Sequence, residues 1–427
     1  MQAVRLSASS LYQRVKSLMP RLLIVTYSLF IISYFLFPSY HSHYRYYAKA
    51  VAIPGLLVLG EGLRDTRQQL VFKLAILYLL YLLTTAAWSS PFELYRFGQM
   101  LTISFYLLIF IAVTHVLRSR FPTGFHHMLR LCIAVAAVAA VASLVVFYQT
   151  HSFPSDRAEG LGALTNVNEY SNVFGVFALL AMGYGLKAES KYARVLYALA
   201  VLCFISFMWF GQSRAAFASL FAALFLFAFI GGKHNRKWVA ILTACALLVL
   251  IAIFPDLLEK AWIRGAGLRP LIWQAMLEDI RQAPFFGQGL ITPMSYIIEG
   301  NDFGHGHNAF LVALWQGGMI GMGLLVLLTG SALWNAYRLG KETGNFTILA
   351  LLVFCVLVMQ TGVNSLISRP RDRWMVFWFP LALLISYQTP LRKCTDSVAG
   401  VEPDKEQATP QTSIKVADED NGERSTT

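Results

Sequence analysis

Two arginines and two histidines stand at the edges of apolar stretches, where their side chains could act on a ligand at a membrane surface. Arg214 follows a tight turn and opens an apolar run, and Arg269 precedes a segment with helical periodicity. His305 and His307 lie immediately before another apolar run. A guanidinium group offers a planar fork of donors to phosphate or carboxylate oxygens, and imidazole can take a proton near neutral pH. These residue types predict a site that binds an anion and removes a proton.

Each arginine also has an ordinary interpretation. The residues after Arg214, from 215 to 230, are apolar and offer its charge no path to water, so the charge is costly without a function or a partner. Arg269 would stand beside a helix N-terminus, where free N–H groups and the helix dipole favour an anion. Either side chain could instead extend to the lipid headgroups. Arg264, in a flexible Arg-Gly-Ala-Gly context, is a weaker candidate for the same anion.

The histidine pair leaves three interpretations open. His307 or His305 could activate a hydroxyl nucleophile. A His-x-His pair is also half of a metal site, but a third ligand such as Glu299 or Asp302 would be needed, and nothing in the spacing requires one. The segment could equally be a turn in which Asn308 caps the next helix. Because nothing in the spacing requires a metal ion, we predict neither a metal ion nor a cofactor, and the role of the two histidines stays open.

A second polar loop, predicted between residues 149 and 168, supplies further hydrogen-bonding groups. Arg157 and Asn168 carry donors and acceptors suited to sugar hydroxyls. They could equally be ordinary turn residues and a helix cap. Both are candidate substrate-binding residues.

Membrane-spanning helices must position these residues. Of 427 residues, 56% are hydrophobic and 14% are charged, whereas a soluble domain has about 25% charged residues. Because a span needs about 20 apolar residues, the hydrophobic residues suffice for about a dozen spans. This composition excludes a secreted protein, a single-span receptor and chemistry in a large soluble head. The predicted fold is an all-α polytopic bundle of twelve spans, near residues 21–38, 47–63, 71–89, 97–117, 128–148, 168–186, 192–210, 213–231, 237–254, 309–334, 345–367 and 373–390.

The spans divide the chain into four regions. Residues 1–254 hold nine spans, residues 255–308 form a long loop, residues 309–390 hold three spans, and residues 391–427 form a tail without aromatic residues that should be disordered. Long loops in economical chains commonly carry function. Within this loop, residues 268–282 place apolar side chains at helical spacing with polar side chains largely opposite. The pattern predicts an amphipathic helix lying at the membrane interface.

The distribution of positive charge predicts the orientation in the membrane. The side that holds both termini carries 23 of the 35 Lys and Arg residues, so both termini should be cytoplasmic under the positive-inside rule. The opposite side carries ten Arg and two Lys. This preference for arginine favours an outward-facing anion site, although a simple bias of lysine toward the cytoplasm would give the same counts. The net charge of +12 lies on the bundle and not on a soluble basic patch, which disfavours a nucleic-acid partner.

Four motifs have an order and spacing found together in one known family. They are Ser213-Arg214 opening a span, Arg269 before Trp273, the stretch Pro284-Phe285-Phe286-Gly287-Gln288-Gly289, and His307-Asn308 followed after nine residues by Gly318-Met319-Ile320-Gly321. The chain resembles the O-antigen ligase and polymerase superfamily of bacterial envelope glycosyltransferases. The last spacing is similar to the ligase signature of a histidine, a small polar residue, nine residues and GxxG. The resemblance covers the C-terminal half by its motifs and the rest by its topology.

The resemblance implies a metal-independent, inverting glycosyl transfer. An O-antigen glycan would pass from undecaprenyl diphosphate to a sugar hydroxyl of lipid A-core, on the periplasmic face of the inner membrane of a Gram-negative bacterium. Arg214 and Arg269, with Arg264, would hold the diphosphate as its negative charge grows, and His307 would accept the proton of the acceptor hydroxyl. The remaining candidates for substrate binding are His305, which is also the alternative base, Arg157, Asn168, Asn308 and Trp273.

Three other functions are compatible with the sequence. An O-antigen polymerase uses the same donor but extends another lipid-linked glycan, and the GxxG spacing favours the ligase over it. An oligosaccharyltransferase that modifies protein often carries more soluble mass. A polytopic lipid or solute transporter, from a different class, should have charges near the bilayer midplane and two related halves. Most charges here lie at the ends of spans.

Overall fold

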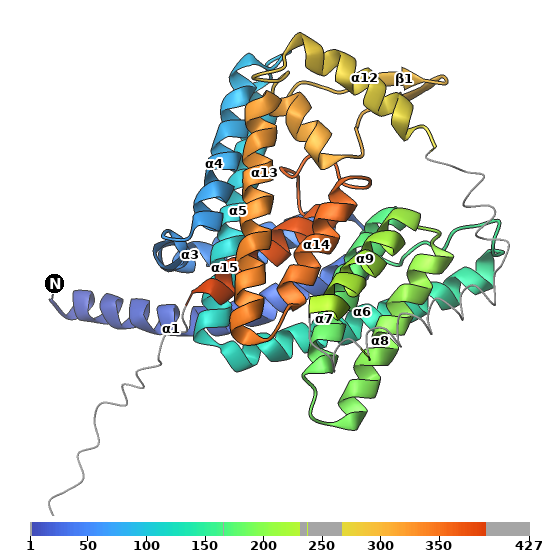
Figure 1. Ribbon diagram of the computed structural model, residues 1–427. Coiled ribbons are helices and arrows are strands. Elements are labelled where there is room, and N and C mark those ends of the chain that lie inside the picture. Colours follow the sequence, from blue (N-terminus) through green and yellow to red (C-terminus); the bar gives the residue numbers. More distant parts are fainter. Residues whose placement is uncertain (1, 165, 231–236, 238–266, 390–427) are drawn as a thin grey trace, which may run out of the picture. The chain divides into compact units, whose positions relative to one another are not determined.

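The computed structural model describes residues 2–164, 166–230, 237 and 267–389, with side chains from Leu18 onward. Within these residues the chain is mostly helical, which confirms the predicted all-α class (Figure 1). In chain order the elements are α1 (Gln2–Leu36), α2 (Tyr40–Tyr46), η1 (Tyr47–Ala52), α3 (Ile53–Thr66), α4 (Leu70–Thr85), η2 (Ala86–Trp88), α5 (Leu94–Arg120), α6 (Pro122–Thr150), α7 (Val167–Leu186), α8 (Lys191–Phe210), α9 (Arg214–Ile230), α12 (Arg269–Gln282), β1 (Tyr296–Ile298), β2 (Asn301–Phe303), α13 (Ala309–Thr343), α14 (Thr347–Met359), η3 (Trp374–Trp378) and α15 (Phe379–Gln388).

Six helical segments in the described residues are long and apolar enough to cross a membrane. They are Leu18–Leu36, Leu70–Trp88, Leu94–Arg120, Pro122–Thr150, Lys191–Phe210 and Ala309–Thr343, and three shorter apolar helices cover Arg214–Ile230, Thr347–Met359 and Trp374–Gln388. The chain is therefore a multi-pass membrane protein by the length and composition of its helices. The count of twelve spans stays a prediction. The predicted span at 237–254, Arg264 and the tail lie outside the described residues, apart from Lys237.

One predicted span differs in its second half. The sequence predicts a span to residue 367, but α14 ends at Met359. The segment that follows is not helical, although Val363, Leu366 and Ile367 are buried. These side chains are apolar because they face the core. A buried irregular segment and a buried helix can have the same apolar composition, so composition alone does not tell them apart. The irregular segment brings polar groups into the protein.

The long loop contains a small β-hairpin that the all-α prediction did not include. Strands β1 and β2 pair antiparallel, with Ile298 opposite Asn301. The two residues between them, Glu299 and Gly300, have φ angles of 53° and 79°. Two positive φ angles are the requirement of the type I′ turn, which matches the twist of paired strands. With strands of three residues each, the hairpin gives almost no alternating pattern to recognise.

The helix α13 is bent where the Gly318-Met319-Ile320-Gly321 sequence begins (Figure 1). Gly318 has φ 62° and ψ −162°, which residues with a Cβ atom rarely adopt. The loop of residues 284–289 binds backbone groups that the bend leaves without helical partners, so that the Met319 N–H donates to the Pro284 carbonyl (2.8 Å). The two glycine-containing motifs of the sequence therefore form one structural unit.

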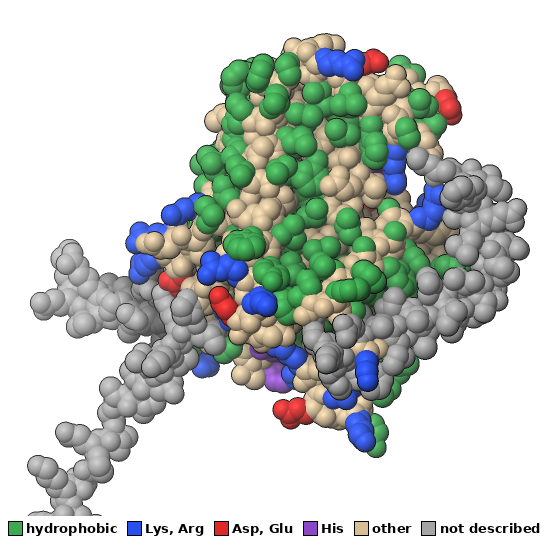
Figure 2. All heavy atoms as spheres, in the orientation of Figure 1, with side chains coloured by type: hydrophobic (Ala, Val, Ile, Leu, Met, Phe, Trp, Pro, Cys, Tyr) green, Lys and Arg blue, Asp and Glu red, His purple; other side chains and the backbone are tan. Residues whose placement is uncertain are grey.

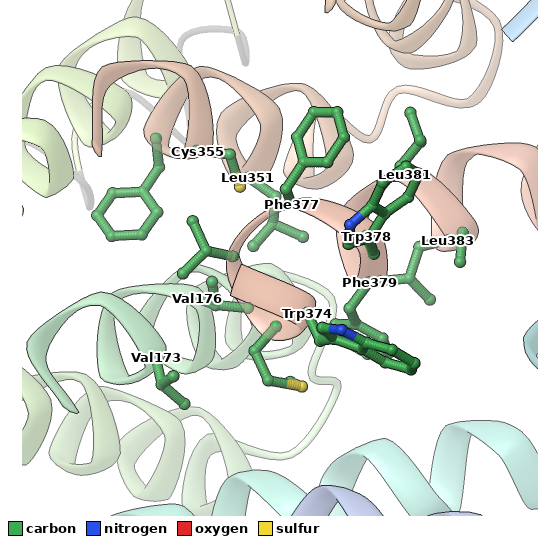
Figure 3. Packing of buried hydrophobic residues seen from close by; sticks show 14 of the residues in the cluster. Val173, Val176, Leu351, Cys355, Trp374, Phe377, Trp378, Phe379, Leu381 and Leu383 are labelled. Atoms are coloured by element: carbon green, nitrogen blue, oxygen red, sulfur yellow. The ribbon is translucent and has the colours of Figure 1, made fainter. Parts of the chain in front are cut away.

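Two tryptophans tie the last irregular segment to the core. Trp374 and Trp378 of η3 are fully buried and lie near apolar side chains of α7 and α14 (Figure 3). The indole N–H of Trp374 donates to the Ser368 carbonyl (2.8 Å), and that of Trp378 donates to the Leu366 carbonyl (2.9 Å). Because buried indole nitrogens need partners, these bonds fix the course of the chain before η3.

Candidate functional site

The turn that carries His307 is held from two sides. The His307 backbone N–H donates to Oδ1 of Asn364 (2.8 Å), which lies in the irregular segment after α14. The indole N–H of Trp273 in α12 donates to the Gly306 carbonyl (2.8 Å). His307 has φ 52°, an uncommon conformation for a residue other than glycine that persists only when the surroundings hold it. Two distant segments thus fix the histidine turn.

The helix α12 is fixed on α13 by its apolar side. Ile272 and Met276 are buried in a cluster of their own with Val312 and Trp315 of α13. A Cβ atom on Gly306 would overlap the sulfur of Met276, so glycine permits the close approach. The structure has a helix, α12, over most of the segment 268–282, starting at Arg269, and part of its apolar side packs against protein. Its location at the membrane interface stays a prediction.

Positive charges converge on His307. Burial, and to a smaller extent the charges of His305, Arg269 and Arg373, lower the pKa of its imidazole to about 4. Burial also lowers the pKa of Arg269, and the nearby charge of Arg214 adds to this effect. The structure therefore brings Arg214, Arg269 and His307 into one electrostatic group, together with Arg373.

His305 lies beside this group and borders an open cleft. Its ring centroid is 4.1 Å from that of His307, with the planes inclined by 63°. The cleft has a volume of about 350 Å³, within the usual range for ligand sites. It is lined mainly by neutral side chains and backbone, namely those of Thr292, Pro293, Met294, Gly304, His305, Val312, Gln316, Asn364 and Ser365.

The turn before Arg214 is built by hydrogen bonds from the second polar loop. The guanidinium group of Arg157 donates from Nε to the Gly211 carbonyl (2.9 Å) and from a terminal nitrogen to Oδ1 of Asn168 (3.1 Å). The Ser213 hydroxyl donates to the same oxygen (3.1 Å). Arg157 and Asn168 thus hold the turn that presents Arg214. Their binding of substrate stays a prediction.

Asn308 acts as a helix cap in the structure. Its side-chain oxygen accepts the backbone N–H groups of Phe310 (3.0 Å) and Leu311 (3.1 Å), at the start of α13. This is the capping arrangement that satisfies N–H groups without helical partners. The predicted contact of Asn308 with substrate has no counterpart in these bonds and stays a prediction.

Sequence analysis did not single out the loop before η3, which contributes to the site. Arg371 pairs with Glu169 of α7 (3.1 Å) and lies over the ring of Tyr40, which donates its hydroxyl proton to the same carboxylate. Asp372 is fully buried, which raises its pKa, while the charges of Arg373 and Arg371 lower it. The signal available in the sequence was three arginines within residues 369–373, on the side where arginine predominates.

Among the described residues, no three His, Cys, Asp or Glu side chains come close enough to hold a metal ion. Asp302, one of the conceivable third ligands, instead accepts the hydroxyl proton of Ser295 in the hairpin (2.8 Å). The expected absence of a metal ion stays a prediction.

Comparison with known proteins addresses the resemblance. No protein-family model matches the chain. The O-antigen ligase of Pseudomonas aeruginosa strain PAO1 is 27% identical over 312 residues, which cover 71% of this chain and 74% of that protein. This similarity supports the O-antigen ligase family. The relative confirms the resemblance, and the four motifs from which it was drawn all lie in the described part of the fold.

Proposed function

We propose that this multi-pass membrane protein is an O-antigen ligase of the Gram-negative inner membrane, acting on the periplasmic side. It would transfer an O-antigen glycan from undecaprenyl diphosphate to a sugar hydroxyl of lipid A-core. The observation that carries the proposal is that Arg269 and Arg373 act on His307 from separate parts of the chain, with Arg214 near Arg269. Its relative's name supports a role in O-antigen processing.

The arginines suit the donor. When the bond between the anomeric carbon and the phosphate oxygen breaks, negative charge grows on the departing undecaprenyl diphosphate. Preorganised guanidinium groups stabilise such charge, and a planar fork binds two phosphate oxygens at once. Arg214 and Arg269 would bind the diphosphate, and Arg264 would assist. No metal ion is needed for this charge stabilisation.

His307 suits the acceptor hydroxyl. Because its pKa is about 4, the imidazole is neutral at pH 7 and has a free lone pair. It would accept the proton as the hydroxyl oxygen attacks the anomeric carbon from the face opposite the diphosphate, which inverts that carbon. The asparagine and tryptophan bonds at the turn would keep the ring in place.

The neutral cleft suits the acceptor sugar. Thr292, Gln316, Asn364 and Ser365 offer hydroxyl and amide groups, which bind sugar hydroxyls without attracting an anion. His305 borders this cleft. We therefore propose that Arg214 and Arg269 bind the donor and that the cleft beside His305 binds the acceptor sugar.

Reconstitution tests the proposal. The purified protein is combined in EDTA with undecaprenyl-diphosphate glycan and lipid A-core, and the mobility of lipid A-core on a gel reports transfer. Arg269→Ala and His307→Ala should lose transfer while folding normally, and Arg281→Ala, which removes an exposed arginine from the other end of α12, should retain it. Elongation of the donor in place of transfer would identify a polymerase. Normal transfer by His307→Ala would refute the assignment of the base.

A further inference from the structure

A second polar cavity lies at the opposite end of α13 from the histidine turn. It has a volume of about 200 Å³ and is formed where α6 and α14 begin and where α7, α13 and α15 end. The predicted topology places all these helix ends on the cytoplasmic side. Its polar lining residues are His126, Tyr184, Lys187, Thr343, Asn345, Thr347 and Tyr387.

The charges around this cavity are positive. The charged neighbours that act on His126 are Arg130, Arg118, Lys187 and His127, all of them basic. No acidic side chain lines the cavity in the part of the chain that the structure describes. A concave site surrounded by one sign of charge raises the local concentration of the opposite ion.

Within the described part of the chain, two of these cations have no carboxylate partner. Arg120 pairs with Glu61, but neither Arg130 nor Lys187 pairs with a carboxylate among the described residues. Arg130 lies 5.6 Å from the ring centre of Tyr184, whose hydroxyl is 2.7 Å from Nδ1 of His126. The cations, the imidazole and the phenol hydroxyl are therefore neighbours.

An apolar groove begins at the same place. It has a volume of about 610 Å³ and runs between α6 and α8, past Ala134, Val138 and Leu199. Arg130 and Tyr197 line one of its ends. The ring of Tyr197 stacks on that of Tyr184, which lines the cavity, with centroids 6.0 Å apart. A cationic cavity and an apolar groove thus meet at one aromatic pair.

We propose that this junction binds a phosphate-bearing lipid. The phosphate occupies the cavity beside His126, Lys187 and Arg130, and one hydrocarbon chain lies in the groove between α6 and α8. Basic pockets between membrane helices commonly bind anionic headgroups in this way. Figure 2 shows several basic side chains in the lower part of this view, below a broad hydrophobic area, and others at its top and right edges. The site does not depend on the proposed transfer reaction.

Native mass spectrometry of the full chain tests the headgroup part. The delipidated protein is titrated with phosphatidylglycerol, phosphatidylethanolamine and inorganic phosphate in separate arms. A basic residue near an anionic surface contributes about fivefold in affinity, so Arg130→Gln with Lys187→Gln should weaken phosphatidylglycerol binding about 25-fold. The matched control is Arg338→Gln with Lys341→Gln on α13, which removes two cations that do not line the cavity. Equal weakening by both pairs would overturn the site.

Separate variants test whether a hydrocarbon chain of the lipid lies in the groove. Ala134→Trp fills the groove and should lower phosphatidylglycerol binding at least tenfold, whereas Leu131→Trp, on α6 and exposed outside the groove, should leave it unchanged. Inorganic phosphate that binds as tightly as the lipid, and equally well to Ala134→Trp, would show that the cavity takes a free anion and would overturn the lipid assignment. Equal affinity for phosphatidylethanolamine and phosphatidylglycerol would overturn the role of the cations.

Discussion

Replacing Arg269 with Gln separates two effects of this arginine, one proposed for the donor and one on the pKa of His307. Its charge would stabilise the departing diphosphate, and it also lowers the pKa of His307, after burial and His305. Loss of the first effect should reduce transfer by a factor on the order of 10²–10³ at every pH. Loss of the second effect should move the acid limb of the pH profile upward, because a cation that disfavours the imidazolium has gone.

The two effects have different sizes at different pH. At pH 7 an imidazole with a pKa of about 4 is almost wholly neutral, and one with the ordinary value of about 6.5 is still roughly three-quarters neutral. Titration therefore cannot account for a hundredfold loss at pH 7. If the pKa of His307 returned fully to 6.5, about one-tenth of the imidazole would be neutral at pH 5.5. The variant would therefore lose at most about tenfold more transfer activity at pH 5.5 than the loss of charge stabilisation alone causes. Burial, His305 and Arg373 remain, which keeps the loss below that limit.

The assay is the pH dependence of kcat/KM, which reports the pKa of the free enzyme, for the unchanged protein and for two variants. Arg269→Gln should show the upward movement of the acid limb, and Arg281→Gln, which removes an exposed arginine of the same helix, should not. If the acid limb is resolved in both proteins and lies at the same pH in Arg269→Gln as in the unchanged protein, then Arg269 does not act on the group that titrates.

Three further changes test the parts that position the site. Trp273→Phe removes the hydrogen bond to the Gly306 carbonyl; we expect a loss of stability of about 1 kcal/mol in thermal unfolding and about tenfold in kcat, and unchanged kcat would contradict a role in holding the histidine turn. Asn308→Ala should cost about 1 kcal/mol and Asn308→Ser much less, because serine also caps helices; equal loss of transfer in both, with unchanged unfolding, would indicate contact with substrate. Gly318→Ala should prevent accumulation of folded protein, since a Cβ would overlap the backbone of Phe285, whereas Gly323→Ala has open space around it and should be tolerated; equal yields of both would contradict the argument.

Sequence analysis proposed the chemical groups of the candidate site more readily than the scaffold that orients them. Arg214 could be proposed because the apolar residues after it offer its charge no path to water, Arg269 because it precedes a predicted helix, and His307 because imidazole can take a proton near neutral pH. Asn364 was not recognisable, because the apolar residues around it indicated a continuing helix. Its role depends on a hydrogen bond to a residue 57 positions earlier in the chain, and no local pattern encodes such a contact. Arg373 was also missed, although it is one of three arginines within residues 369–373.

In the fold, too, some features could be predicted from the sequence and others could not. Hydrophobic runs located the long helices, because a span requires about 20 apolar residues. The bend at Gly318 was not predicted, since a helix interrupted by one residue keeps its apolar composition. Its cause is the backbone of residues 284–289, which docks against the bend. The GxxG sequence was visible as a motif, but its structural meaning required the partner segment.

The charges that would bind the donor also couple donor binding to the activation of the acceptor. In the absence of donor, Arg269 and Arg373 help keep the pKa of His307 at about 4, so the imidazole is neutral but a weak base. A bound diphosphate would offset these cations, and an anion near an imidazole raises its pKa toward the working pH, where a general base is most effective. His307 would then become an effective base only when donor is present, which limits deprotonation of acceptor or water at an empty site. The acid limb of kcat, which reports the enzyme–substrate complex, should accordingly lie at higher pH than that of kcat/KM. Coincident limbs would contradict this coupling.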